Sequence, residues 1–189
     1  MAAIQQHALA ASRASRRLGD YRIGRIEFQH HRLLLDVVES VLHANPSEWV
    51  FLRELRVGTG FRNTSLQRLD AFALNCFAHL GMKRICYEVK TSRADYLCEM
   101  KHPLKRRLGM RYSNEFYFVT QAGMLTPCEV PVECGLIEIE GGFPVVKIPA
   151  PWRETPGPTW QFVASMIRNQ RRVFEERVVP PSQQRFGFE

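Results

Sequence analysis

The 189-residue sequence predicts an α/β fold: a mixed central β-sheet flanked by helices, with a helical extension at the C-terminus. Three observations support this. First, apolar residues at helical spacing precede three short apolar runs that suit strands. Second, a helical segment with a capping pattern separates these runs from two or three more. Third, an amphipathic helical segment follows a proline-rich stretch. The length suits one well-buried core, and 45% apolar and 24% charged residues are ordinary for a globular protein.

The first predicted element is a helix that starts near Ile26 and ends at Asn45-Pro46. Strands are expected at residues 49–55, 66–76 and 84–90, because apolar and β-favouring side chains there are bounded by glycine turns. The apolar side of the helix consists of Ile26, Leu33, Leu34, Val37, Val38, Val41 and Leu42.

The second half of the chain begins with a helix at Ser92, since Ser92 with Asp95 three residues later is a capping-box pattern. Pro103 interrupts that helix, and a basic segment follows through Arg111. Further strands are expected at residues 115–120, 135–139 and 143–148, the last of them an edge strand. The final helix has one apolar side, formed by Trp160, Val163, Ile167 and Phe174.

These elements divide the chain into three parts. Residues 1–20 form a flexible basic arm, residues 21–148 hold the folded domain, and residues 149–189 form a Pro-rich linker, the C-terminal helix and a loose tail. Five cysteines at irregular positions indicate neither a disulfide framework nor a zinc pair, so we expect a reducing, cytoplasmic location. No apolar run is long enough to span a membrane.

The formal net charge of +7, with a pI near 9.5, favours a polyanionic partner, and DNA in particular. Ser92 could contact phosphate near the start of its helix, although capping alone would explain it. The basic group downstream is expected either to contact the phosphate backbone or to form a solvated face. It comprises Lys101, Lys105, Arg106, Arg107 and Arg111.

The most informative segment is the predicted strand over residues 84–90. Its period of two places Ile85, Tyr87 and Val89 on one face, and Cys86, Glu88 and Lys90 on the other. A carboxylate and an ammonium on a buried strand are costly unless they meet each other, a metal or a substrate. A further acid, Asp70, lies in the preceding predicted strand.

This pattern suits metal-dependent phosphodiester hydrolysis. Asp70 and Glu88, converging from neighbouring strands, could bind a hard divalent ion such as Mg²⁺, for which Mn²⁺ could substitute, and the Val89 carbonyl could add a ligand. Lys90 could orient or deprotonate the attacking water, or stabilise charge on the phosphate. A solvent-exposed ion pair remains the simpler interpretation of Glu88 and Lys90.

The chain resembles the PD-(D/E)xK nuclease superfamily, with its restriction-endonuclease-like fold, and within it the MmcB-like DNA-repair proteins and small phage and bacterial nucleases. The resemblance spans residues 30–140 and depends on Asp70, the run from Tyr87 to Tyr96, the strand from Glu115 to Val119, and the segments Val130-Pro131 and Cys134–Ile137. Leu69 stands where the superfamily often has proline, and the residues after Ile148 have no counterpart.

The resemblance implies a Mg²⁺-dependent endonuclease that leaves a 5′-phosphate. Such an enzyme would act in DNA repair, recombination or phage DNA metabolism, and it could act as a homodimer. It also implies a further acid from near the first helix, for which Glu54 is the better match and Glu39 the inferior one. Two alternatives stay open: a DNA-binding module without catalysis, and a structural adaptor with a chance Glu-x-Lys. The adaptor would hold Asp70 and Glu88 too far apart to share an ion.

Overall fold

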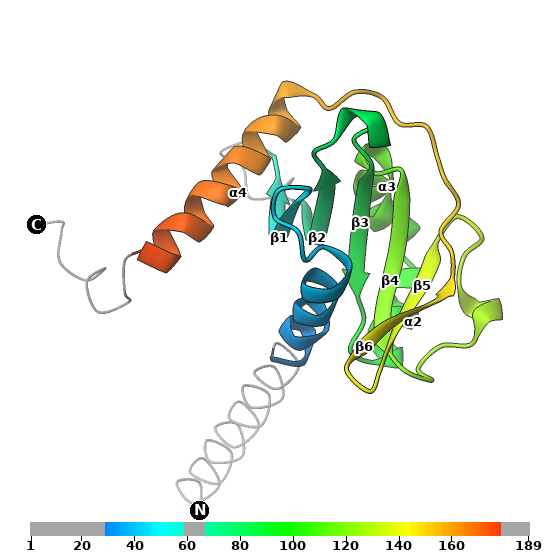
Figure 1. Ribbon diagram of the computed structural model, residues 1–189. Coiled ribbons are helices and arrows are strands. Elements are labelled where there is room, and N and C mark those ends of the chain that lie inside the picture. The colour runs from blue at the N-terminus through cyan, green and yellow to red at the C-terminus, as the bar shows by residue number, and fades with distance from the viewer. Residues whose placement is uncertain (1–28, 59–66, 179–189) are drawn as a thin grey trace, which may run out of the picture.

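The computed structural model describes residues 29–58 and 67–178, which are built around a six-stranded sheet in the order β1-β2-β3-β4-β5-β6 (Figure 1). The first three strands pair antiparallel, β3, β4 and β5 pair in parallel, and β6 returns antiparallel to β5. The predicted mixed sheet is therefore confirmed. The strands are β1 (Trp49–Val57), β2 (Gln67–Asn75), β3 (Arg84–Val89), β4 (Glu115–Gln121), β5 (Gly135–Glu140) and β6 (Phe143–Ile148).

The three predicted helices are present in the predicted order, and one further helix lies between the second and the third. The N-terminal helix is described over residues 29–42, and the helix after Ser92 is confirmed as α2 (Arg93–Met100), with Ser92 Oγ accepting from the Asp95 N–H at 3.2 Å. The basic segment that follows the interruption at Pro103 folds as a further helix, α3 (Arg106–Tyr112). The extension is α4 (Trp160–Val178), and short 3₁₀ helices are η1 (Ala78–Leu80), η2 (Pro103–Lys105) and η3 (Pro127–Glu129).

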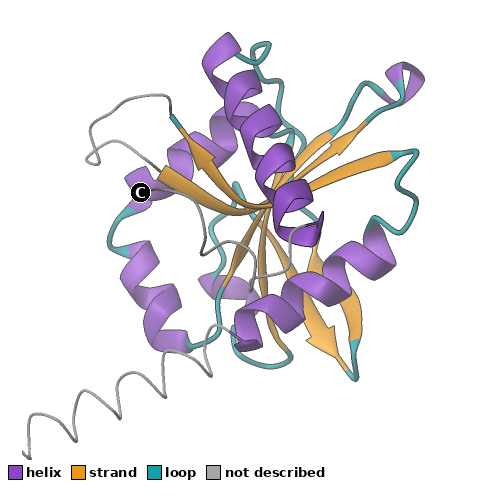
Figure 2. Cartoon of the chain, turned by 90° about the vertical axis from the view of Figure 1, so that its left-hand side faces the viewer, coloured by secondary structure: helices purple, strands orange, loops and turns teal. Residues whose placement is uncertain are grey.

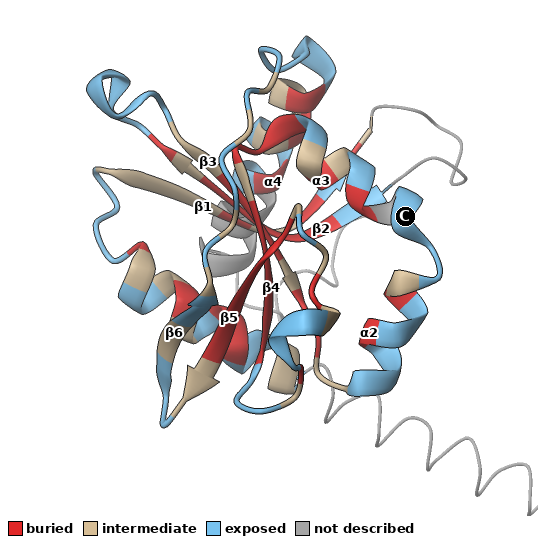
Figure 3. Cartoon of the chain, turned by 90° about the vertical axis from the view of Figure 1, so that its right-hand side faces the viewer, coloured by how far each residue is buried: buried red, intermediate tan, exposed pale blue. Residues whose placement is uncertain are grey.

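Helices cover both faces of the sheet, which twists strongly when viewed along its edge (Figure 2). Leu34, Leu35 and Val38 of the N-terminal helix pack on one face. Tyr96 of α2, together with residues of α3 and α4, packs on the other. The central strands are consequently buried on both sides, whereas much of edge strand β6 remains accessible (Figure 3). No described helix has both the length and the apolar character required to cross a bilayer.

Strand β3 has the two faces that its period predicts. Ile85, Tyr87 and Val89 belong to the core beneath the N-terminal helix, whereas Cys86 belongs to the core beneath α2 and α3. Helix α3 lies very close to β3, because a Cβ added to Gly109 would approach the Cys86 sulfur to 2.8 Å. All five cysteines are free, in agreement with the absence of a disulfide framework.

The predicted apolar face of α4 is wrong in part. Trp160 and Ile167 are 87% and 64% exposed, and the helix instead buries Phe162, Ser165 and Asn169. The reason is that α4 packs along β1, an edge strand whose backbone groups need partners. Asn169 Nδ2 donates to the carbonyl of Arg53 at 2.9 Å, so polar side chains occupy part of the buried stripe.

The Pro-rich stretch before α4 is irregular, as predicted, but it is tied to the sheet. The Arg153 N–H donates to the Asn114 carbonyl at 2.9 Å, and the Asn114 side chain donates back to the Arg153 carbonyl at 3.0 Å. Arg84 donates to the Thr155 hydroxyl at 2.8 Å. The predicted basic arm (residues 1–20) and the tail after Pro180 lie outside the described residues.

Candidate active site

The candidate site lies at one end of the sheet, where β2 begins and β3 ends. The β2–β3 ladder stops at the pair Ala71–Tyr87, and the next residues on the two strands are Asp70 and Glu88. Beyond that point, the Val89 N–H donates to Asp70 Oδ2 at 3.0 Å. The two acids that the sequence separates by 17 residues thus come from adjacent positions on neighbouring strands.

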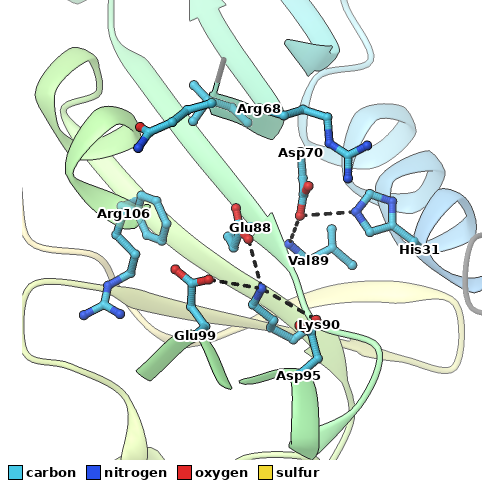
Figure 4. Close-up of a pocket in the computed structure, with 12 residues that line it drawn as sticks. His31, Arg68, Asp70, Glu88, Val89, Lys90, Asp95, Glu99 and Arg106 are labelled. Carbon is cyan, nitrogen blue, oxygen red and sulfur yellow. Dashed lines mark hydrogen bonds and ion pairs between the residues drawn. The ribbon is translucent and has the colours of Figure 1, made fainter. Parts of the chain in front are cut away.

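A cavity of about 540 Å³ opens at this end of the sheet, and Figure 4 shows its residues. Asp70 lies between Glu88 on one side and His31 on the other, with Lys90 below Glu88 (Figure 4). The structure therefore brings together the predicted residues Asp70, Glu88, Val89 and Lys90. The cavity is lined by His31, Gln67, Arg68, Leu69, Asp70, Glu88, Val89, Lys90, Asp95, Glu99, Arg106 and Phe116.

Lys90 is a buried cation surrounded by carboxylates. Its side chain is only 5% exposed, and its Nζ lies 2.9 Å from Glu88, 3.6 Å from Asp95 and 3.8 Å from Glu99. Burial lowers the pKa of Lys90, but the charge and hydrogen bond of Glu88 outweigh burial and raise it overall. Lys90 therefore stays protonated at neutral pH, which favours a role as charged donor over a role as base.

Glu88 experiences the opposite balance. Burial and the negative charge of Asp70 raise the pKa of Glu88 to about 7, despite the stabilising contact with Lys90. At neutral pH the cavity thus holds more negative charge than its one close ammonium neutralises, and the Glu88 carboxylate is only partly ionised. A cation beside Glu88 and Asp70 would relieve this repulsion.

Asp70 is buried and keeps its charge through its partners. Burial raises the pKa of Asp70, but the contact with His31, the Val89 N–H and the charge of Lys90 lower it overall. His31 Nε2 lies 3.2 Å from Asp70 Oδ2. Burial lowers the pKa of His31, yet Asp70 raises it overall.

Glu54 lies beside this group and Glu39 does not. The carboxylate of Glu54 and a ligand atom each from His31 and Asp70 lie within 4.8 Å of one another. Glu54 has a positive φ of 53°, which is uncommon for a residue other than glycine. Glu39 instead contacts Arg53 on another part of the surface, so Glu54 is the better candidate, as the sequence suggested.

The predicted DNA-contacting residues separate into two groups. Lys101, which follows the C-terminal end of α2, and Arg107 and Arg111 of α3 are exposed. Arg106 is buried in the cavity wall, with its guanidinium 3.4 Å from Glu133, so it does not belong to the exposed basic face. The hydroxyl of Ser92 serves as the α2 cap, and the side chain of Lys105 is not described.

Sequence reasoning missed His31 and Glu99. Adjacent histidines on a helix point in different directions, which argued against a shared metal site but left His31 free to face Asp70 alone. Glu99 lies one helical turn after Asp95, on the same side of α2, and both contact Lys90. That i, i+4 spacing, counted from the predicted cap, was the available signal for Glu99.

Comparisons with known proteins address the fold alone. No protein-family model matches the sequence, and no curated protein is significantly similar to it. A solved structure of a protein of unknown function from Silicibacter pomeroyi is similar over 82% of this chain and 94% of that chain, with a TM-score of 0.54 and 20% identity. At this identity the similarity shows a shared fold and carries no activity across.

Proposed function

We propose that the protein is a Mg²⁺-dependent DNA endonuclease with a restriction-endonuclease-like core. The observation that carries this proposal is the convergence of Asp70, Glu88 and Lys90 on one cavity from neighbouring strands. Two carboxylates and an ammonium that line one cavity are the groups that metal-assisted phosphodiester hydrolysis requires. The resemblance to the PD-(D/E)xK superfamily assigns these same three residues to the active site.

The donor set fits a hard divalent ion. Asp70 and Glu88 supply carboxylate oxygens, which Mg²⁺ prefers, and Glu54 is placed to add another. The raised pKa of Glu88 reflects burial and the repulsion from Asp70, both of which a bound cation would offset. Val89 would contribute through its backbone carbonyl oxygen, while its N–H donates to Asp70.

Each residue then has a definite task. A bound divalent ion would supply Lewis acidity at the phosphate and activate water. Asp70, held by the Val89 N–H, and ionised Glu88 would hold that ion and accept hydrogen bonds from water. Lys90 remains protonated and places its positive charge where negative charge develops on the phosphate. Glu88, Asp95 and Glu99 fix the position of Lys90.

DNA is the proposed partner because exposed basic side chains lie just after α2 and on α3, and the acids of α2 line the cavity. Cleavage would leave a 5′-phosphate and a 3′-hydroxyl, in repair, recombination or phage DNA metabolism, as the resemblance implies. A cytoplasmic location agrees with five free cysteines.

Cleavage of plasmid and linear DNA by Glu88→Ala and Lys90→Ala variants tests the proposal. Both should lose at least about 100-fold in rate with Mg²⁺ or Mn²⁺, because each removes a group in contact with the ion or the phosphate. The matched controls are Glu140→Ala and Lys147→Ala, an ion pair between the end of β5 and edge strand β6, which should cleave like wild type. Equal cleavage by all four variants would contradict the assignment.

A DNA-binding module without catalysis is the second candidate. It is favoured by one observation: Lys90 already has three carboxylate neighbours, so the cavity is electrostatically organised without an ion. Metal-independent DNA binding, together with no cleavage of linear, nicked or branched DNA, would support the module over the nuclease.

A further inference from the structure

We infer that His31, Glu54 and Asp70 form a binding site for a divalent first-row transition ion, which the protein prefers to Mg²⁺. The inference deepens the proposed function, on which it rests through Asp70, and it adds a nitrogen ligand that the sequence did not suggest. Three elements supply the ligands: the N-terminal helix, β1 and β2 (Figure 4 shows the two from the cavity lining).

The three side chains lie close enough to share one ion. One ligand atom from each of the three residues lies within 4.8 Å of the other two, and His31 Nε2 lies 3.2 Å from Asp70 Oδ2. Ligand atoms around one ion, each about 2.0–2.2 Å from it, lie about 3–4 Å apart, so small side-chain movements suffice to close the site.

The His31 side chain has a buried nitrogen that lacks a hydrogen bond within the described part of the chain. Its Nε2 is shielded from solvent and makes no well-directed hydrogen bond with any described group. Buried polar atoms are almost always satisfied by a partner, and here the close contact is an acid oxygen that is already bonded to the Val89 N–H. A metal ion bound between His31 and Asp70 would give this nitrogen a partner.

Glu54 lies on β1, next to the strand that carries Asp70. Its register on β1 places it opposite Asp70, since its neighbours Arg53 and Leu55 pair with Ala71 and Leu69. Its carboxylate is now 2.7 Å from Arg68 in a largely exposed ion pair, which is weak and easily exchanged for a metal ion.

The donor types decide which ion is preferred. Carboxylate oxygens alone suit Mg²⁺, which dehydrates reluctantly and rarely takes imidazole ligands. An imidazole nitrogen with two carboxylates suits first-row transition ions, whose affinity for nitrogen donors exceeds that of Mg²⁺. The site should therefore bind Mn²⁺, the probe used below, more tightly than Mg²⁺, and His31 should be the cause.

The test measures Mn²⁺ binding to the metal-free protein by loss of the free-ion EPR signal, with Mg²⁺ as competitor. Wild type should bind Mn²⁺ at least about tenfold more tightly than Mg²⁺, and His31→Gln should weaken Mn²⁺ binding about 10–100-fold while changing Mg²⁺ affinity less than threefold. The control is His30→Gln, the neighbouring residue whose ring contacts Gln121, and it should bind like wild type.

Pulsed EPR of the Mn²⁺ complex gives a direct readout of the ligand. Wild type and His30→Gln should show coupling to an imidazole nitrogen, and His31→Gln should not. Glu54→Gln keeps the histidine and provides a second variant should His31→Gln fold poorly: it should weaken Mn²⁺ binding and retain the nitrogen coupling. Absence of nitrogen coupling in wild type would overturn the inference.

Failure of this inference and failure of the nuclease proposal give different results. If His31→Gln binds Mn²⁺ as wild type does while wild type still cleaves DNA, the transition-ion site is wrong and the nuclease stands. If wild type shows nitrogen coupling but cleaves no DNA, the site stands and the nuclease is wrong.

Discussion

The backbone N–H of Val89 donates to Oδ2 of Asp70 at 3.0 Å, and this bond joins the two halves of the candidate site. Val89 stands between Glu88 and Lys90, so the strand that carries these two residues also fixes the acid of its neighbour. A backbone donor cannot rotate away, so the Val89 N–H holds one oxygen of Asp70 in place, and His31 contacts that same oxygen.

Replacement of Asp70 by Asn should lower the pKa of His31 to below its ordinary value of 6.5. The Asn side-chain oxygen can still accept from the Val89 N–H, so the geometry is kept while the charge is lost. Burial, which lowers the pKa of His31, would then act unopposed by Asp70. NMR titration of the metal-free protein measures this. Asp36→Asn, on the same helix but in contact with Arg53, should leave the His31 pKa unchanged.

Glu88→Gln should make the metal-free protein more stable at pH 8. The pKa of Glu88 is raised from 4.5 to about 7, so between these values the folded state binds more protons at this residue than the unfolded state does. The free energy of unfolding therefore falls as pH rises through this window, by at most about 3 kcal/mol. Gln mimics the protonated acid and avoids this loss.

Urea unfolding in the presence of a chelator measures the effect of Glu88→Gln. The variant should exceed wild type by about 1–3 kcal/mol at pH 8, and the difference should shrink towards pH 5. Glu140→Gln at the end of β5 is the matched control, and its difference from wild type should show little dependence on pH. A Glu88→Gln variant less stable than wild type at pH 8 would show that the pair with Lys90 outweighs the cost of burying the charge.

The alternation along β3 could be predicted because side-chain direction in a strand follows from period two alone. The sequence pattern by itself therefore places Asp70, Glu88 and Lys90 on candidate strands. His31 could not be placed in this way, because its position depends on where the N-terminal helix crosses the sheet, which no local pattern specifies. Helix spacing gave the buried face of that helix only in part, and it gave none of its neighbours across the sheet. Leu34 and Val38 are buried as predicted, but Leu33 and Val41 are exposed, and the buried Leu35 lies outside the predicted set.

The face of α4 shows a second limit. Hydrophobic periodicity selected Trp160 and Ile167, both exposed, over Ser165 and Asn169, both buried. The helix covers an edge strand, and Asn169 bonds to its backbone at Arg53. Periodicity assumes that a buried stripe is apolar, and this assumption fails where a helix must also satisfy backbone groups.

Glu99→Gln should impair cleavage more than Asp95→Asn, although the two carboxylates lie 3.8 Å and 3.6 Å from the Lys90 ammonium. The side chain of Glu99 is 5% exposed and that of Asp95 is 52% exposed, so solvent screens the second interaction far more than the first. We expect a loss of about tenfold or more for Glu99→Gln and less than threefold for Asp95→Asn. Initial cleavage rates in saturating Mg²⁺ measure both effects. If Glu99→Gln cleaves DNA as fast as wild type, Glu99 has no role in positioning Lys90.

Removal of the exposed cations around α3 should weaken DNA binding in a salt-dependent way. Lys101, Arg107 and Arg111 are exposed, whereas Arg106 is buried beside Glu133. If the three exposed side chains each neutralise a phosphate, replacing all three by Ala should reduce the slope of log K against log salt by about 2–3.

Fluorescence anisotropy with duplex DNA, in a Glu88→Gln background without divalent ions, measures that slope. The control is Lys147→Ala on edge strand β6, which removes a cation that is already paired with Glu140. This variant should leave the slope unchanged. An unchanged slope in the triple variant would mean that these side chains form only a solvated face. The DNA would then have to bind elsewhere, because counterion release depends on the number of phosphates neutralised and not on the net charge of the protein.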